Sequence, residues 1–223
     1  MSDGRYTDPE FDAAALVTID TQCDVLDGAP LQIDGTSQAL GAMRLLAEEF
    51  RRAARPIVHV VRIYEPDGSN VDACRRALVE DGVRILATDA PGTEIAPELL
   101  PEPGLRLDGR LLLAGGLQQL GPREVAIYKP RWGAFFRTAL EDHLRELGVT
   151  TLVFCGANFP NCPRTSIYQA SERDFRIVVA RDGLSGLYER GEHELAAIGV
   201  HVLDSAEIAR ALVKGRFSVP SGA

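Results

Sequence analysis

The residues around Cys162 are the ones whose types and spacing are best suited to chemistry. Cys162 stands between Asn161 and Pro163, a few residues after the apolar run 151–155. A short apolar run of this kind is typical of a buried strand, and proline is well tolerated in the first turn of a helix. Cys162 is therefore predicted to be the N-cap of a helix that begins at Pro163. A thiol there faces free backbone N–H groups and the positive end of the helix dipole, which favour the nucleophilic thiolate.

Two charged residues stand at comparable places in the chain. Asp20 follows the apolar run 13–19, and Lys129 follows the run 123–128. Ligands of open α/β sheets bind at the carboxyl ends of the strands, so we expect Asp20, Lys129 and Cys162 to converge there. Such a group would make an activated nucleophile. Asp20 can accept the thiol proton and later return it to a leaving amine, while the Lys129 ammonium favours both thiolate and carboxylate.

The elements that must position these residues alternate along the chain as apolar strands and amphipathic helices. Helices between parallel strands predict an α/β fold with a doubly wound, mostly parallel sheet and helices on both faces. We expect one domain over residues 1–223, in which segment 64–122 forms loops of the active site or of an interface. The expected strands are 13–19, 57–61, 123–128, 151–155, 177–180 and 200–203, and the expected helices are 36–54, 71–80, 136–147, 163–174, 189–198 and 205–213.

The composition of the chain excludes several classes of partner and of structural site. With 24 Lys and Arg against 32 Asp and Glu, the net charge of −8 argues against nucleic acid and anionic membranes as partners. No apolar run is long enough to cross a bilayer, and residues 1–6 do not resemble a signal peptide. The four cysteines include no Cys-x-x-Cys pair, which argues against a disulfide scaffold and a structural zinc site. We expect a reduced, cytoplasmic protein that acts on a small molecule.

Three segments of the chain, in order, resemble the motifs of the isochorismatase-like cysteine hydrolases. They are Asp-Thr-Gln-Cys-Asp at 20–24, Lys-Pro-Arg-Trp-Gly-Ala-Phe at 129–135, and the turn that carries Cys162. The resemblance extends over about residues 14–200. It implies a six-stranded parallel sheet, a homo-oligomer, and a triad of Cys162, Asp20 and Lys129. Such a triad cleaves a C–N bond of a small amide, lactam or ureido compound through a thioester and without a cofactor.

The resemblance also implies how the oxyanion is held. In the family a cis peptide precedes the fourth residue upstream of the cysteine, which here is the bond between Ala157 and Asn158. That bond turns a backbone N–H toward the oxyanion. Carried over to this chain, the oxyanion hole consists of the N–H groups of Asn158 and Cys162. Losing one such donor typically costs about 2.7–4 kcal/mol of transition-state stabilisation.

The sequence departs from the family pattern in two places. Nicotinamidases of the family bind a metal through an Asp-x-His pair after the second strand. Here Arg-Ile-Tyr-Glu follows Val61, and no histidine occurs between His59 and His143. We therefore expect no metal and no pyridine-carboxamide substrate. The connection at 101–120 is also longer than in the family, and this insertion could cap the pocket or extend a subunit interface.

Five further residues are candidates for the substrate pocket. Trp132 and Phe135 follow Lys129 closely and could be apolar walls or packing residues. Arg164 lies in the first helical turn, where a cation is disfavoured, so it either holds a substrate carboxylate or is simply exposed. Gln22 and Asn161, like Asn158, could donate hydrogen bonds to substrate or to the triad.

Two other functions stay open from the sequence. One is a vinyl-ether or ester hydrolase on the same scaffold, although isochorismatases that cleave vinyl ethers can lack the cysteine. The other is a catalytically silent binding or interaction protein. The presence of Cys162 favours amide chemistry.

Overall fold

The computed structural model describes residues 4–214, which fold around a seven-stranded sheet in the order β3-β4-β2-β1-β5-β6-β7. β3 pairs with β4 in the antiparallel sense, and the other neighbouring strands are parallel. The strands are β1 (Ala14–Ile19), β2 (Ile57–Val61), β3 (Leu117–Gly121), β4 (Glu124–Tyr128), β5 (Thr151–Gly156), β6 (Arg176–Leu184) and β7 (His201–Leu203).

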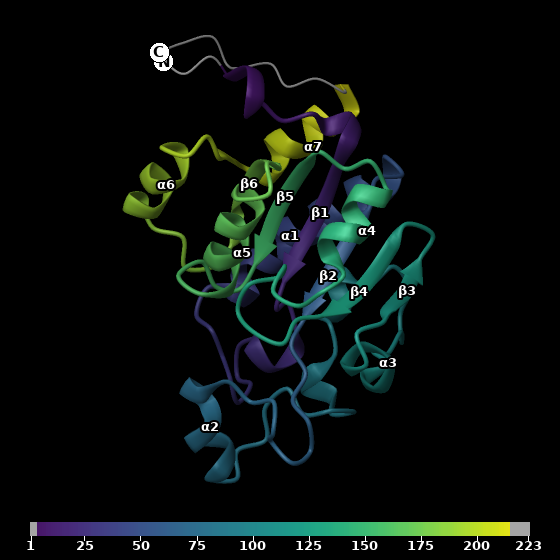
Figure 1. Cartoon of the computed structure of the whole chain (residues 1–223), viewed down its shortest axis with the longest axis vertical. Coiled ribbons are helices and arrows are strands. Elements are labelled where there is room, and N and C mark those ends of the chain that lie inside the picture. Colours follow the sequence, from purple (N-terminus) through teal and green to yellow (C-terminus); the bar gives the residue numbers. More distant parts are fainter. Residues whose placement is uncertain (1–3, 215–223) are drawn as a thin grey trace.

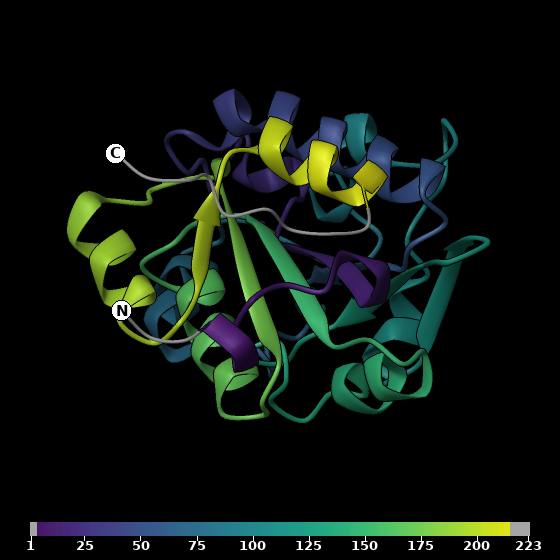
Figure 2. The ribbon, with the colours of Figure 1, turned by 90° about the horizontal axis from the view of Figure 1, so that it is seen from above.

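Helices cover both faces of the sheet, as Figure 2 shows. α1 and α7 lie side by side on one face, and α4 and α5 cover the other, with α6 at its flank. Because both faces are covered, every residue of β1, β2 and β5 is buried. The helices are α1 (Thr36–Arg52), α2 (Ala73–Glu80), α3 (Gly109–Leu113), α4 (Leu140–Glu146), α5 (Cys162–Ser171), α6 (Glu189–Ala196) and α7 (Ser205–Lys214), and short 3-10 turns occupy Gly4–Tyr6, Phe11–Ala13, Cys23–Val25, Pro91–Thr93 and Pro97–Leu99.

The predicted doubly wound, mostly parallel sheet is confirmed, but the predicted count of six strands is wrong. The seventh strand is β3, which lies in the segment 101–122 that we expected to be loops. β3 was missed because it is an edge strand in which only Leu120 is buried, so its apolar pattern is weak. The helix before it, α3, has five residues and gives no clear helical pattern that would mark where the strand begins. Leu112 and Leu120 join the main core, so this segment extends the sheet along β4.

The strand order places two strand ends side by side where the chain changes direction. From β1 the chain builds outward through β2 and β4, and from β5 it builds to the other side through β6 and β7. The carboxyl ends of β1 and β5 are therefore adjacent at the switch point, where open α/β sheets bind ligands. In Figure 1 both strands point toward the end of the molecule from which α2 projects. Among residues 4–214, no helix is long and apolar enough to span a membrane.

Candidate active site

Asp20 and Lys129 form a buried ion pair at the carboxyl edge of the sheet. Lys129 Nζ lies 2.8 Å from Asp20 Oδ2, and the lysine side chain is fully buried. Both residues continue the parallel ladder, since the Asp20 N–H donates to the Val60 carbonyl and the Lys129 N–H to the Val61 carbonyl, each at 3.0 Å. Asp20 has a φ of +50°, an uncommon backbone conformation for a residue other than glycine. Its Oδ1 atom has no regular hydrogen-bond partner among residues 4–214.

Cys162 lies at the end of the neighbouring strand, as expected, and is only 3% exposed. The helix begins one residue earlier than predicted, so Asn161 is the N-cap and Cys162 the first helical residue. The turn before it depends on Gly156, whose φ is +126°. A Cβ at Gly156 would lie 2.2 Å from the Ile19 carbonyl oxygen, so only glycine allows β5 to approach β1 this closely.

The expected thiolate at Cys162 is wrong for the free protein. Burial raises the pKa of the Cys162 thiol to about 11; the negative charge of Asp20 and its hydrogen bond with the thiol also raise this pKa, whereas the charges of Lys129 and Arg62 lower it. The helix dipole favours a thiolate only weakly compared with the loss of water around a buried sulfur. The resting site therefore holds a neutral thiol beside the Asp20 carboxyl group, which is the arrangement of a nucleophile next to its base.

The expected cis peptide between Ala157 and Asn158 is also wrong, because no cis peptide bond occurs in the described part of the chain. The trans form is the intrinsically favoured one for a bond that does not precede proline. The turn is made instead by Gly156 and by Asn161, whose ψ is −106°. The N–H groups of Asn158 and Cys162 nevertheless donate to no acceptor among residues 4–214.

The loop that follows Lys129 is fastened to the helix of Cys162. The Ala134 N–H donates to Ser166 Oγ at 3.0 Å, and Ser166 Oγ donates in turn to the Cys162 carbonyl at 2.7 Å. The Phe135 N–H donates to Gln169 Oε1 at 3.0 Å. Sequence reasoning did not single out Ser166 and Gln169. Their positions four and seven residues after the cysteine, on one face of the helix, were the available signal.

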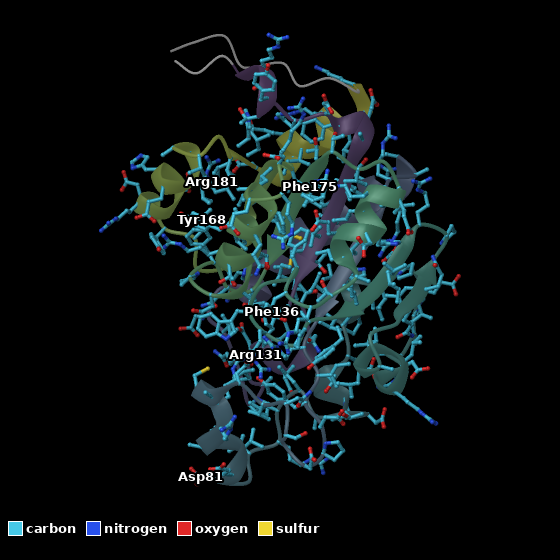
Figure 3. The ribbon with its side chains drawn as sticks, in the orientation of Figure 1. Asp81, Arg131, Phe136, Tyr168, Phe175 and Arg181 are labelled. Carbon is cyan, nitrogen blue, oxygen red and sulfur yellow. The ribbon has the colours of Figure 1, made fainter. Side chains whose placement is uncertain are left out.

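A hollow of about 540 Å³ lies between α2, the loop after Lys129 and α5, and its lining includes none of Asp20, Lys129 and Cys162. Trp132 and Phe136 are exposed on its wall, and Figure 3 shows Phe136 and Arg131 between the sheet and α2. Phe135 does not belong to this wall, since it is buried in the core against Phe175. Of the two aromatic residues expected as walls, Trp132 lies at the hollow and Phe135 is a packing residue.

The structure gives the other pocket candidates different partners. Arg164 binds Glu194 and the Tyr188 hydroxyl of the α6 region, each at 2.6 Å, so its guanidinium is already paired. Asn161 Nδ2 donates to Asn158 Oδ1 at 3.0 Å, which fixes the turn before Cys162. Both asparagines are thus bonded to each other across the turn rather than to the triad.

Gln22 is fully buried, and its amide bonds only to backbone. Its Nε2 donates to the carbonyls of Arg62 (2.8 Å) and Thr93 (2.5 Å), and its Oε1 accepts the Arg62 N–H at 2.8 Å. Both ends of the Gln22 amide are therefore occupied by backbone groups, and its suggested contact with the substrate stays a prediction. It fixes the backbone of the residue that directly follows β2.

That residue, Arg62, is the charged side chain that sequence reasoning missed. It is 1% exposed, and its charge lowers the pKa of the Cys162 thiol. Nη1 lies 3.4 Å from the Asp72 carboxylate, while Nε and Nη2 have no hydrogen-bond partner among residues 4–214. Asp72 also accepts a hydrogen bond of 2.8 Å from the Tyr64 hydroxyl, and it lines the hollow.

The residues after β2 do not fit the metal site of nicotinamidases. Arg62 places a guanidinium at this strand end, and a guanidinium is a donor that cannot ligate a cation. Within residues 4–214, no three His, Cys, Asp or Glu side chains are grouped so that they could hold a metal ion. The expectation that the reaction needs no metal stays a prediction.

The comparisons with known proteins agree with the fold and identify the family. The model of the isochorismatase domain matches residues 113–207. The uncharacterized isochorismatase family protein YecD of Escherichia coli O157:H7 is 31% identical over 173 residues, which cover 77% of this chain and 79% of YecD. The ureidoacrylate amidohydrolase RutB of Methylobacterium radiotolerans is 22% identical over 211 residues, 89% of this chain and 74% of RutB.

A solved structure supports the same conclusion. The isochorismatase family protein from Desulfovibrio vulgaris superposes with a TM-score of 0.76 and 29% identity, over 90% of this chain and 98% of that one. The chain therefore belongs to the isochorismatase family, as the three motifs suggested.

Proposed function

We propose that this protein is a cysteine hydrolase that cleaves a C–N bond of a small carboxamide, lactam or ureido compound through a thioester on Cys162. The observation that carries the proposal is the buried Asp20–Lys129 ion pair at 2.8 Å, beside a thiol whose pKa the Asp20 charge raises. The relative RutB, named a ureidoacrylate amidohydrolase, supports a C–N bond as the target.

The reaction starts from the neutral thiol. Asp20 removes the thiol proton as Sγ attacks the carbonyl carbon, so negative charge moves from the carboxylate to the carbonyl oxygen. The N–H groups of Asn158 and Cys162 are unpaired and available to this oxyanion. Asp20 then gives its proton to the leaving nitrogen, the C–N bond breaks, and a thioester remains. Asp20 next takes a proton from water, which attacks the thioester, and the acid leaves as the thiol regains its proton.

Lys129 holds the Asp20 carboxylate in place during these transfers. Its buried Nζ lies 2.8 Å from Oδ2, while Oδ1 of the same carboxylate has no regular hydrogen-bond partner among residues 4–214. Oδ1 is therefore the oxygen that can take and return the proton. Removing Lys129 would leave a buried carboxylate without a counter-charge, which typically costs about 3–5 kcal/mol.

The experiment is ammonia release from a panel of primary carboxamides and ureas, with ring opening followed for lactams. The native protein is compared with C162A, and both are measured with and without EDTA. We expect turnover that is absent in C162A and unchanged by EDTA, together with an acyl-enzyme mass after acid quench. Release that persists in C162A, or turnover of esters and vinyl ethers alone, would contradict the proposal.

A further inference from the structure

Arg62 is a buried cation with an incomplete set of partners. Arg62 is 1% exposed, yet in the described part of the chain the one acceptor bonded to its guanidinium is Asp72, 3.4 Å from Nη1. Nε and Nη2 have no partner among residues 4–214. Buried charges in folded proteins are normally paired and hydrogen-bonded, because an unsatisfied charged donor is costly. Two free donors on one buried guanidinium therefore indicate that a partner from outside the protein binds there.

The identity of the two free atoms defines the partner. Nε–H and one N–H of Nη2 lie on the same edge of the planar guanidinium and point in parallel directions. This edge is the fork that accepts both oxygens of a carboxylate at once, whereas a single carbonyl oxygen would use only half of it. The opposite side of the group, at Nη1, is the side held by Asp72. The protein thus uses one edge to fix the guanidinium and leaves the bidentate edge free.

The charged side chains around Arg62 have a net positive charge that an anion would neutralise. Arg62 and Arg75 share one carboxylate, that of Asp72, at 3.4 and 3.7 Å. Lys129 is paired with Asp20. These buried ion pairs hold more positive than negative charge while the thiol is neutral, although the whole chain carries −8. A substrate carboxylate would balance the excess.

The position of Arg62 connects this anion to the reaction. It directly follows β2, which lies between β1 and β4 in the sheet, so its backbone stands between those of Asp20 and Lys129. Its charge acts on the Cys162 thiol, and its partner Asp72 lines the hollow between α2 and α5. Gln22 clamps the Arg62 backbone with two hydrogen bonds of 2.8 Å. Arg62 therefore stands at the same edge of the sheet as Cys162, with its backbone fixed and its charge acting on the thiol.

We infer that the substrate is a ureido or carboxamido acid, and that Arg62 binds its carboxylate through the Nε and Nη2 edge while Cys162 attacks the amide or ureido carbon. This inference rests on the proposed function and narrows it to substrates with an anionic group. Arg62 is a specificity-determining residue in this role, and Gln22 is the residue that positions it.

The test pairs each acid with a neutral compound of the same shape. N-carbamoylglycine is compared with isobutylurea, and succinamate with 4-methylpentanamide, because a branched methyl pair replaces the two carboxylate oxygens. We expect the native protein to favour each acid in kcat/KM by at least about 100-fold. R62Q should reduce kcat/KM for the acids by about 100-fold or more, chiefly through KM, and should affect the neutral compounds far less, because for them only the effect of the Arg62 charge on the thiol is lost. R62K should keep part of the preference, since it retains the charge without the fork.

Two controls separate recognition from stability and bulk charge. R76Q removes the same charge from an exposed position on α2, so it should leave the preference intact. Thermal unfolding of R62Q checks that the variant folds. An equal loss for acids and neutral compounds in a folded R62Q would mean that Arg62 is structural, and no preference in the native protein would overturn the inference.

Binding to the inactive C162S variant keeps this inference separate from the proposed function. Calorimetry should detect N-carbamoylglycine or succinamate binding to C162S, and the double variant C162S/R62Q should bind at least about 50-fold more weakly. If no compound is turned over but this binding depends on Arg62, the inference stands and the proposed function fails. If turnover depends on Cys162 but acid binding ignores R62Q, the inference fails and the proposed function stands.

Discussion

Replacing Asp20 with Asn should make Cys162 more reactive toward alkylation while abolishing hydrolysis. With a thiol pKa of about 11, only about 3 in 10,000 molecules carry the thiolate at pH 7.5. An unperturbed thiol of pKa about 8.5 would be about 10% ionised, roughly 300-fold more. Asp20 is the charge that raises this pKa, and in D20N the neighbouring Lys129 and Arg62 still lower it. Burial, the largest cause of the raised pKa, remains in D20N, and each unit by which the pKa falls would raise the thiolate fraction, and the alkylation rate, about 10-fold.

The assay is the rate of carbamidomethylation of Cys162 by iodoacetamide, followed by peptide mass spectrometry from pH 6 to 11. The native rate should still be rising near pH 11, and the D20N rate should level off at a lower pH. K129M removes the opposite charge of the same ion pair and should slow alkylation, while D81N, exposed at the end of α2, should match the native protein. The reasoning is refuted if D20N reacts no faster than the native protein, or if the native rate is already constant above pH 8.

Three further predictions concern two substitutions that should reduce stability and one at Arg164, the pocket candidate that is paired with Glu194. Burial raises the pKa of Glu124, but hydrogen bonds from Arg51 and a buried histidine lower it more, to below 4.5. The ionised Glu124 therefore contributes its full stabilisation above pH 4.5, and this stabilisation is lost as the pH falls through the lowered pKa. Urea unfolding of E124Q should show a free energy of unfolding about 3–5 kcal/mol lower at pH 7. Below about pH 5 the stability of E124Q should depend less on pH than that of the native protein. Because a Cβ at Gly156 meets the Ile19 carbonyl, G156A should lose at least about 2 kcal/mol in the same assay, and native-like stability would contradict the turn geometry. R164Q breaks a half-exposed ion pair and should cost about 0–1 kcal/mol, with kcat/KM within twofold of native; a selective loss on acidic substrates would return Arg164 to the pocket.

Most of the sheet could be predicted because its central strands are continuous apolar runs. β1, β2 and β5 are buried over their whole length and stand out in the sequence for that reason. β3 could not be found this way, because an edge strand beside water needs apolar side chains only where it touches the core. In β3 that is Leu120. The sequence therefore predicts the strands that carry the site better than the strand that ends the sheet.

The placement of Asp20, Lys129 and Cys162 could be predicted because each follows an apolar run and parallel strands end at one edge. The same rule applies to Arg62, which directly follows β2, but no motif drew attention to it. Arg164 was considered instead because a cation in the first turn of a helix is locally unfavourable. Its partner Glu194 lies 30 residues away on α6, a pairing that sequence spacing does not reveal. The unfavourable interaction of Arg164 with the helix dipole was a poor guide to its role, because the distant Glu194 carboxylate offsets that interaction.

The thiol at Cys162 was predicted with the wrong charge because a helix dipole is visible in sequence and burial is not. The dipole contributes in the first turn only, whereas burial and the Asp20 charge act on the sulfur together. The consequence is chemical. A thiolate next to the Asp20 carboxylate would place two negative charges in a buried site, and a neutral thiol avoids this. In the proposed mechanism the proton moves only when a carbonyl oxygen is present to take up the charge, so the same burial that keeps the free thiol protonated would tie its activation to substrate binding.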